Sequence, residues 1–207
     1  MRHILAGLAA LALLVPAPAP AEDDFELGVL AALNAARTHP QAYVQSLEIY
    51  RGYYRGDLVQ EPGRQILLRT KEGISAVDEA IGFMRRQPPL PPLSPNAPLE
   101  RAARDHVEDQ GSRGLVGHGG SDGSGPEQRI GRYSVWHRAI AEDIAYDDAT
   151  PAGVVMELII DDGVADRGHR TNIFDPHMRL AGIACGPHRV YGRMCVIDFA
   201  AAISPKP

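Results

Sequence analysis

Apolar side chains recur every three to four residues in five stretches of the chain, and this period predicts five amphipathic helices. The stretches span residues 27–39, 40–50, 74–86, 99–111 and 151–162. Pro40 suits the first turn of the second helix and forces the first helix to end near His39, because a residue before proline avoids helical geometry. Thr150 and Pro151 supply the N-cap and first turn of the fifth helix, which Gly163 ends.

The pattern changes near the C-terminus. Two short runs rich in β-branched and aromatic residues, 181–185 and 194–199, are separated by turn residues and predict a β-hairpin. Residues 88–98 are rich in proline and predict an extended connector. Residues 111–125 contain seven glycines and predict an irregular loop. The stretch after residue 50 is loop-like, and strands at Leu58-Val59 and Ile66-Leu68 stay unassigned.

The first residues have the order of an export signal. Arg2-His3 precedes an apolar stretch from Ile4 to Val15, and the small residues Ala19-Pro20-Ala21 precede an acidic segment. This order predicts a secretory signal peptide over residues 1–21, and therefore a secreted or periplasmic protein. A buried first helix is disfavoured because three prolines follow the apolar stretch.

Composition narrows the class of protein. The 207 residues are 44% hydrophobic, which fits one globular domain over residues 22–207. With 26 acidic against 21 basic residues the net charge is −5, so we expect no nucleic-acid partner. No apolar run approaches the roughly 20 residues of a membrane-spanning helix. Outside the cytoplasm, Cys185 and Cys195 are expected to form a disulfide, and a hairpin tip at Val190 would place them face to face.

Four polar positions carry the candidate chemistry. His118 lies among glycines and His169 follows a glycine, so both imidazoles would be open to a ligand. Glu142 interrupts the apolar run 139–145, where a buried carboxylate would need a partner. Asp161, with Asp162 beside it, ends the fifth helix, where the helix dipole disfavours negative charge.

Structural interpretations stay open for the same positions. Either aspartate could form an ion pair with Arg167 or Arg170, and Glu142 could lie on a solvated face. His106 shares a helix face with apolar residues and is expected to be a packed, hydrogen-bonded core residue. Residues 119–123 match the hydrolase motif G-x-S-x-G, but glycines on both sides of Ser121 argue against the strand and helix that the motif needs. The spacings match no short zinc motif.

Taken in order, these segments resemble the CAP superfamily, named for cysteine-rich secretory proteins, antigen 5 and pathogenesis-related plant proteins, and specifically its bacterial secreted branch. The segments are Leu33-Asn34-Ala35-Ala36-Arg37, residues 99–106, Gly117-His118, Ala141-Glu142-Asp143-Ile144-Ala145, Gly168-His169-Arg170-Thr171-Asn172-Ile173 and the strands that close at Asp198-Phe199. The resemblance implies an α+β fold, a three-layer α-β-α sandwich with a central antiparallel sheet. Residues 51–87 lie outside the family pattern and are interpreted as an insertion that could wall one side of a cavity.

The resemblance also implies what the site does. It implies a surface cavity lined by His118, Glu142, Asp161 and His169, in which Asp161 is the better match to the second acid. The two histidines would bind a divalent cation such as Zn²⁺, or the cavity would take a small-molecule or lipid ligand. The alternative is a hydrolase in which Glu142 with a histidine, or a metal-activated water, acts as general base. Asp143 stands where the family usually has Asn, and the added acidity favours a cation; no nucleotide cofactor is expected.

Overall fold

The computed structural model describes residues 22–63, 65–147 and 149–206, so the predicted signal peptide over residues 1–21 lies outside it. Its main sheet has four strands in the order β4-β6-β7-β5. They are β4 (Ser94–Pro95), β6 (Leu180–His188), β7 (Gly192–Pro205) and β5 (Ser134–Tyr146). β5, β6 and β7 pair antiparallel, and the short β4 joins β6 in parallel. β5 therefore forms one edge of the sheet.

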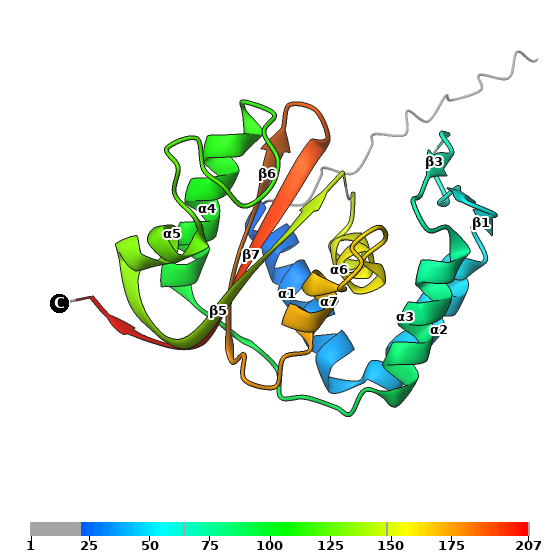
Figure 1. Cartoon of the computed structure of the whole chain (residues 1–207), viewed down its shortest axis with the longest axis horizontal. Helices are drawn as coiled ribbons and strands as arrows, with labels where there is room; N and C mark the ends of the chain where they lie inside the picture. Colours follow the sequence, from blue (N-terminus) through cyan, green and yellow to red (C-terminus); the bar gives the residue numbers. More distant parts are fainter. Residues whose placement is uncertain (1–21, 64, 148, 207) are drawn as a thin grey trace, which may run out of the picture.

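Helices cover both faces of this sheet (Figure 1). One face carries α4 (Ala97–Gly111) and α5 (Pro126–Tyr133), and the other carries α1 (Glu22–Thr38), α6 (Pro151–Ile160) and α7 (Gly168–Ile173). The three-layer α-β-α sandwich is confirmed. No helix among the described residues is long and apolar enough to cross a membrane.

A further pair of helices packs outside the layer of α1, α6 and α7 (Figure 1). These helices are α2 (Pro40–Arg51) and α3 (Ile74–Arg86). In the sequence, α2 and α3 are separated by a three-stranded sheet made of β1 (Tyr54–Arg55), β2 (Leu58–Val59) and β3 (Leu68–Arg69). Most of the segment 51–87 thus forms a small subassembly on the flank of the sandwich.

Alternation along the strands assigns side chains to the two sides of the sheet. On β7, Met194, Val196 and Ala200 pack with α4 and α5, whereas Cys195, Ile197 and Phe199 pack with α1 and α6. Asp198 follows the first set, as does Glu142, its register partner on β5. The next residue, Asp143, therefore faces α6 and α7. Neighbouring acidic residues are in this way directed into different layers.

The predicted hairpin and disulfide are both confirmed. Cys185 on β6 and Cys195 on β7 are register partners, and their sulfurs are bonded across a Cα–Cα distance of 4.1 Å. Val190 lies in the turn between the two strands. The disulfide therefore closes a short loop at the end of the sheet.

Arg37, the last residue of the segment 33–37, is a structural residue. It is fully buried, and its guanidinium donates to the carbonyl oxygens of Pro91 at 3.1 Å and Met178 at 3.2 Å. Burial lowers its pKa to about 10. Because a buried guanidinium needs several acceptors, this arginine fixes the proline-rich connector against the sandwich.

The structure also corrects one predicted boundary. The sequence pattern predicts a helix to residue 162, but α6 ends at Ile160. Asp161 has φ +57°, in the left-handed region, and this geometry interrupts the helical hydrogen bonds. The change of direction turns the Asp161 side chain toward the following helix, α7.

Candidate functional site

His118 and Glu142 form the first histidine–carboxylate pair. The His118 side chain is 50% exposed, and its Nδ1 lies 2.9 Å from Oε1 of Glu142, whose side chain is 1% exposed. Gly117 has φ +88°, which favours glycine, and its amide donates to the hydroxyl of Tyr146 on β5 at 3.0 Å. The loop is thereby held against β5 with the imidazole over the strand's carboxylate.

Glu142 is held in place by a buried cation. Arg129 on α5 is 1% exposed and its Nη2 donates to Oε2 of Glu142 at 2.6 Å, while Nη1 donates to the carbonyl oxygen of His118 at 3.1 Å. Burial alone would raise the pKa of Glu142, but the hydrogen bond from His118 and the charge of Arg129 outweigh it and lower the pKa. Glu142 is therefore ionised and compensated.

Asp198 lies across from Glu142 in the sheet and is fully buried. Burial, followed by the neighbouring charge of Glu142, raises the pKa of Asp198 well above its ordinary value. Neither carboxyl oxygen of Asp198 accepts a hydrogen bond from the described residues. A protonated Asp198 can instead donate to Glu142, so this pair holds one negative charge and one proton.

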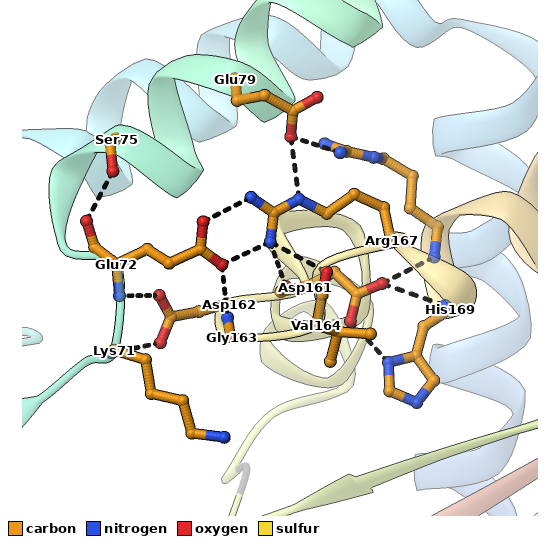
Figure 2. Close-up of polar contacts among 11 residues, drawn as sticks. Lys71, Glu72, Ser75, Glu79, Asp161, Asp162, Gly163, Val164, Arg167 and His169 are labelled. Atoms are coloured by element: carbon orange, nitrogen blue, oxygen red, sulfur yellow. Dashed lines mark hydrogen bonds and ion pairs between the residues drawn. The ribbon is translucent and has the colours of Figure 1, made fainter.

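His169 and Asp161 form the second pair (Figure 2). Nδ1 of His169, on α7, lies 2.7 Å from Oδ1 of Asp161, and the His169 amide donates to Oδ2 at 3.0 Å. The His169 side chain is 24% exposed and that of Asp161 only 1%. Burial would lower the pKa of His169, but the hydrogen bond to Asp161 and the charge of Asp161 outweigh burial and raise the pKa.

The two adjacent aspartates have different roles. Asp162 accepts hydrogen bonds from the backbone amides of Lys71 at 2.6 Å and Glu72 at 2.8 Å, so it binds the segment before α3. The sequence left open which of the two aspartates pairs with His169, and in the structure Asp161 makes this contact. Arg167 and Arg170 were possible ion-pair partners of either aspartate. Their guanidinium groups pair instead with Glu72 and Glu79 on the flanking segment.

Asp143 lies on the α7 side of β5 and is fully buried. Its Oδ1 accepts a hydrogen bond from Nδ2 of Asn172 at 2.7 Å. Burial raises the pKa of Asp143 to about 8, so its carboxyl group is largely neutral at pH 7. A neutral acid thus occupies the position where the resemblance leads us to expect an amide, and the expected gain in acidity is reduced.

The two pairs flank the same edge strand without joining. His118 contacts a carboxylate on the α4–α5 side of β5, and His169 belongs to the layer on the other side. Within residues 22–63, 65–147 and 149–206, no three His, Cys, Asp or Glu side chains are grouped so as to hold a metal ion. Two surface hollows have volumes of about 340 and 300 Å³, and neither is lined by His118, Glu142, Asp161 or His169.

Two other residues singled out from the sequence have structural contacts. His106 is fully buried and its Nε2 lies 2.9 Å from the carbonyl oxygen of Gly117, as expected for a packed core histidine. Ser121 donates to Asp109 on α4, and the G-x-S-x-G segment lies in a loop that no strand enters. The serine-hydrolase interpretation is therefore not supported.

The sequence matches the profile of CAP, the Cysteine-rich secretory protein family, over residues 30–199. The chain belongs to the CAP family. The matched range begins within α1, ends in β7 and includes both histidine–carboxylate pairs of this CAP domain.

Two solved structures are similar to this CAP domain. One is an extracellular protein containing a SCP domain from Bacillus anthracis str. Ames, with 15% identity, a TM-score of 0.43 and coverage of 61% of this chain and 37% of that chain. The other is an outer surface protein from Borrelia burgdorferi, with 19% identity, a TM-score of 0.46 and coverage of 56% of this chain and 80% of that chain. The match thus spans little more than a third of the Bacillus protein. No curated protein matches the chain at a significant level.

Sequence reasoning misses Arg129 and Asp198, although weak signals exist for both. Asp198 stands in an apolar run, two residues after Val196 and two before Ala200. Because every second residue of a strand faces the same side, this position indicates a buried acid. Arg129 could be found only by asking which cation compensates Glu142, and the sequence offers many arginines for that role.

Proposed function

We propose that this CAP domain is an extracellular binding module for a divalent cation, with Zn²⁺ as the first candidate. The cation would be held at the edge of β5 by Nε2 of His118 and Nε2 of His169. One observation carries the proposal. In both pairs Nδ1 engages a nearly buried carboxylate, and Nε2 of the partly exposed imidazole has no hydrogen bond to the described residues. Metal-binding histidines usually make this second contact, because it fixes the ring and its tautomer.

The donor chemistry fits zinc, whereas the number of donors fits only an open site. Neutral imidazole is a preferred zinc ligand, but both carboxylates are already engaged through Nδ1. Two imidazoles would leave coordination positions for water or for an oxygen of a small-molecule ligand. Such a cation would supply Lewis acidity to that oxygen. A lipid ligand, the other partner implied by the resemblance, has no separate support.

The proposed compartment is secreted or periplasmic. The order of residues 1–21 supports export, and a disulfide persists most readily in an oxidising compartment. Fractionation of expressing cells, with the N-terminus of the purified protein sequenced, tests this. Recovery of the intact chain in the cytoplasm would contradict it.

Calorimetric titration of the purified protein with Zn²⁺ tests the cation site. We expect one ion per chain and a loss of affinity of about 100-fold or more in His118→Ala and in His169→Ala. The matched control is His177→Ala, because His177 also pairs with an aspartate, Asp175, at 2.9 Å but its side chain is 72% exposed and belongs to neither candidate pair. Equal affinity in all four proteins would reject the site. Binding of two independent ions would show that His118 and His169 do not share one ion.

The proposal also fixes a pH dependence. Zinc binds neutral imidazole, so protonation of either histidine competes with the metal. Asp161 keeps the pKa of His169 above the ordinary value near 6.5, so the affinity should already decline above pH 6.5 as pH is lowered. Titrations from pH 8 to pH 5 measure this, and a flat profile would contradict imidazole ligation.

A hydrolase is the second candidate, since His118 with Glu142 behind it has the geometry of a general base and its orienting acid. Glu142 would position the ring, and Nε2 of His118 would take a proton from water. A panel of ester, peptide and phosphate substrates, with and without Zn²⁺, tests it. Activity should disappear in His118→Gln and persist in His177→Gln; no turnover of any substrate would leave the binding module alone.

A further inference from the structure

The turn between α6 and α7 places the second pair, and it has an unusual backbone. It begins at Asp161 with φ +57° and ends at Arg167 with φ +52°, so two non-glycine residues are left-handed. Each such residue is less stable than in ordinary geometry by on the order of 1 kcal/mol or more, and it persists only where surrounding contacts fix it. Contacts from outside the turn must therefore hold it.

The side chain of Arg167 links the turn to residues outside it (Figure 2). Its Nη1 and Nη2 donate to the two carboxylate oxygens of Glu72 at 2.6 and 2.7 Å. Nη1 also donates to the carbonyl oxygens of Asp161 at 2.7 Å and Val164 at 3.2 Å, and Nε donates to Glu79 at 3.2 Å. One guanidinium thus connects the flanking segment 51–87 to the backbone of the residue that holds His169.

Glu72 and its neighbours complete the connection from the other side. Oε1 of Glu72 accepts a hydrogen bond from the Gly163 amide at 2.7 Å, and Asp162 accepts from the amides of Lys71 and Glu72. The hydrogen bond from Arg167 lowers the pKa of Glu72 to about 2, so Glu72 is ionised at neutral pH. The turn and the segment are joined by reciprocal bonds.

We propose that Arg167, anchored by Glu72, is a positioning residue for His169. It fixes the carbonyl of Asp161 in the left-handed turn, and this places the Asp161 carboxylate against Nδ1 of His169. The planar guanidinium suits the task because it donates to a carboxylate and to carbonyls at once, which a lysine ammonium reproduces only in part. The segment 51–87 thus influences the position of the His169 imidazole through Arg167.

The tautomer of His169 in metal-free protein is the direct readout. Two-bond ¹H–¹⁵N correlation spectra at pH 8.5 report which ring nitrogen carries the proton. In the native protein Asp161 should keep the proton on Nδ1. In Arg167→Gln and in Glu72→Gln the spectrum should move toward the Nε2–H tautomer of a free histidine, while His118 stays unchanged.

Arg51→Gln is the matched control. Arg51 makes a similar two-bond ion pair with Asp78 on α3, within hydrogen-bonding distance at 2.5 and 3.1 Å, but this pair does not contact the turn. Arg167→Lys should restore part of the native signal. The double variant Arg167→Gln/Glu72→Gln should change the tautomer no more than Arg167→Gln alone, because both residues act through one contact.

An unchanged His169 tautomer in Arg167→Gln and Glu72→Gln would overturn the proposal, as would an equal change in Arg51→Gln. If Arg167→Gln fails to fold, Glu72→Gln decides alone. The effect on zinc rests on the proposed function: affinity should fall about 10- to 100-fold in Arg167→Gln. Failure of the native protein to bind Zn²⁺ would count against the cation site only, since the tautomer readout contains no metal.

Discussion

Asp143 shows how burial changes the chemistry of a single side chain. An ionised aspartate here would be a third negative charge between Glu142 and Asp161. Full burial instead keeps its carboxyl protonated up to about pH 8. Its Oδ2 accepts no hydrogen bond from the described residues, which fits a neutral acid better than a carboxylate. Asp143 therefore serves as a partner for Asn172 and adds little charge to the site.

Asp143→Asn should stabilise the protein, and increasingly so as pH rises. The folded carboxyl holds its proton up to about pH 8, while the unfolded one loses it near pH 4. The folded state thus binds more protons in this window, and native stability falls as pH rises through it. Asn has no proton to lose, so the gain at pH 8 is on the order of a few kcal/mol. Urea unfolding at pH 4.5 and pH 8 measures it; the same difference at both would contradict the assignment.

Among the elements, the β6–β7 hairpin depends on its disulfide. Cys185 and Cys195 are direct register partners and close a loop with a sequence separation of 10. Restricting so short a loop in the unfolded chain contributes about 2–3 kcal/mol. Replacing both cysteines by alanine should lower the free energy of unfolding by that amount in urea. A reductant should destabilise the native protein equally and leave the double variant unchanged; a larger effect on the variant would point to another cause.

Elements with a regular apolar period were predictable from the sequence, whereas β5 was not. Glu142 and Asp143 place acids on both faces of this strand, and a register shift after His137, where Arg138 has φ +71°, interrupts its alternation. α5 and α7 have eight and six residues, too few for a helical period to emerge. Both strand and helices are recognisable only through the contacts that they make in the folded chain.

The candidate pairs were predictable only through the family resemblance. His118 and Glu142 are 24 residues apart, and no spacing rule connects a glycine-rich loop to a strand at that distance. Asp161 and His169 are 8 apart, but their contact requires the left-handed turn that ends α6. Arg129 holds Glu142 from 13 residues away, and Arg167 pairs with Glu72 from 95 residues away. The sequence alone therefore does not reveal the contacts that position the two pairs.

For the whole molecule, the buried ionisable groups define a pH range of greatest stability. Asp143 and Asp198 have raised pKa values, so folding weakens as pH rises above their unfolded values near 4. The raised pKa of His169 contributes stability that is complete below about pH 6.5 and is lost as pH rises further. Glu142 and Glu72 have lowered pKa values, so their contribution is present above about pH 4.3 and is lost as pH falls through the folded-state pKa of each, which is about 2 for Glu72.

These opposing slopes predict a stability maximum near pH 4.5, well below neutrality. Urea midpoints measured at pH 3 to 9 without added metal should rise, pass this maximum and decline. In Asp143→Asn the decline on the alkaline side should become shallower, while the acid side, which depends on Glu142 and Glu72, should not change. A maximum above pH 7.5 in the native protein would mean that the buried acids are ionised in the folded state, and the assignment of neutral carboxyl groups to Asp143 on β5 and Asp198 on β7 would then be wrong.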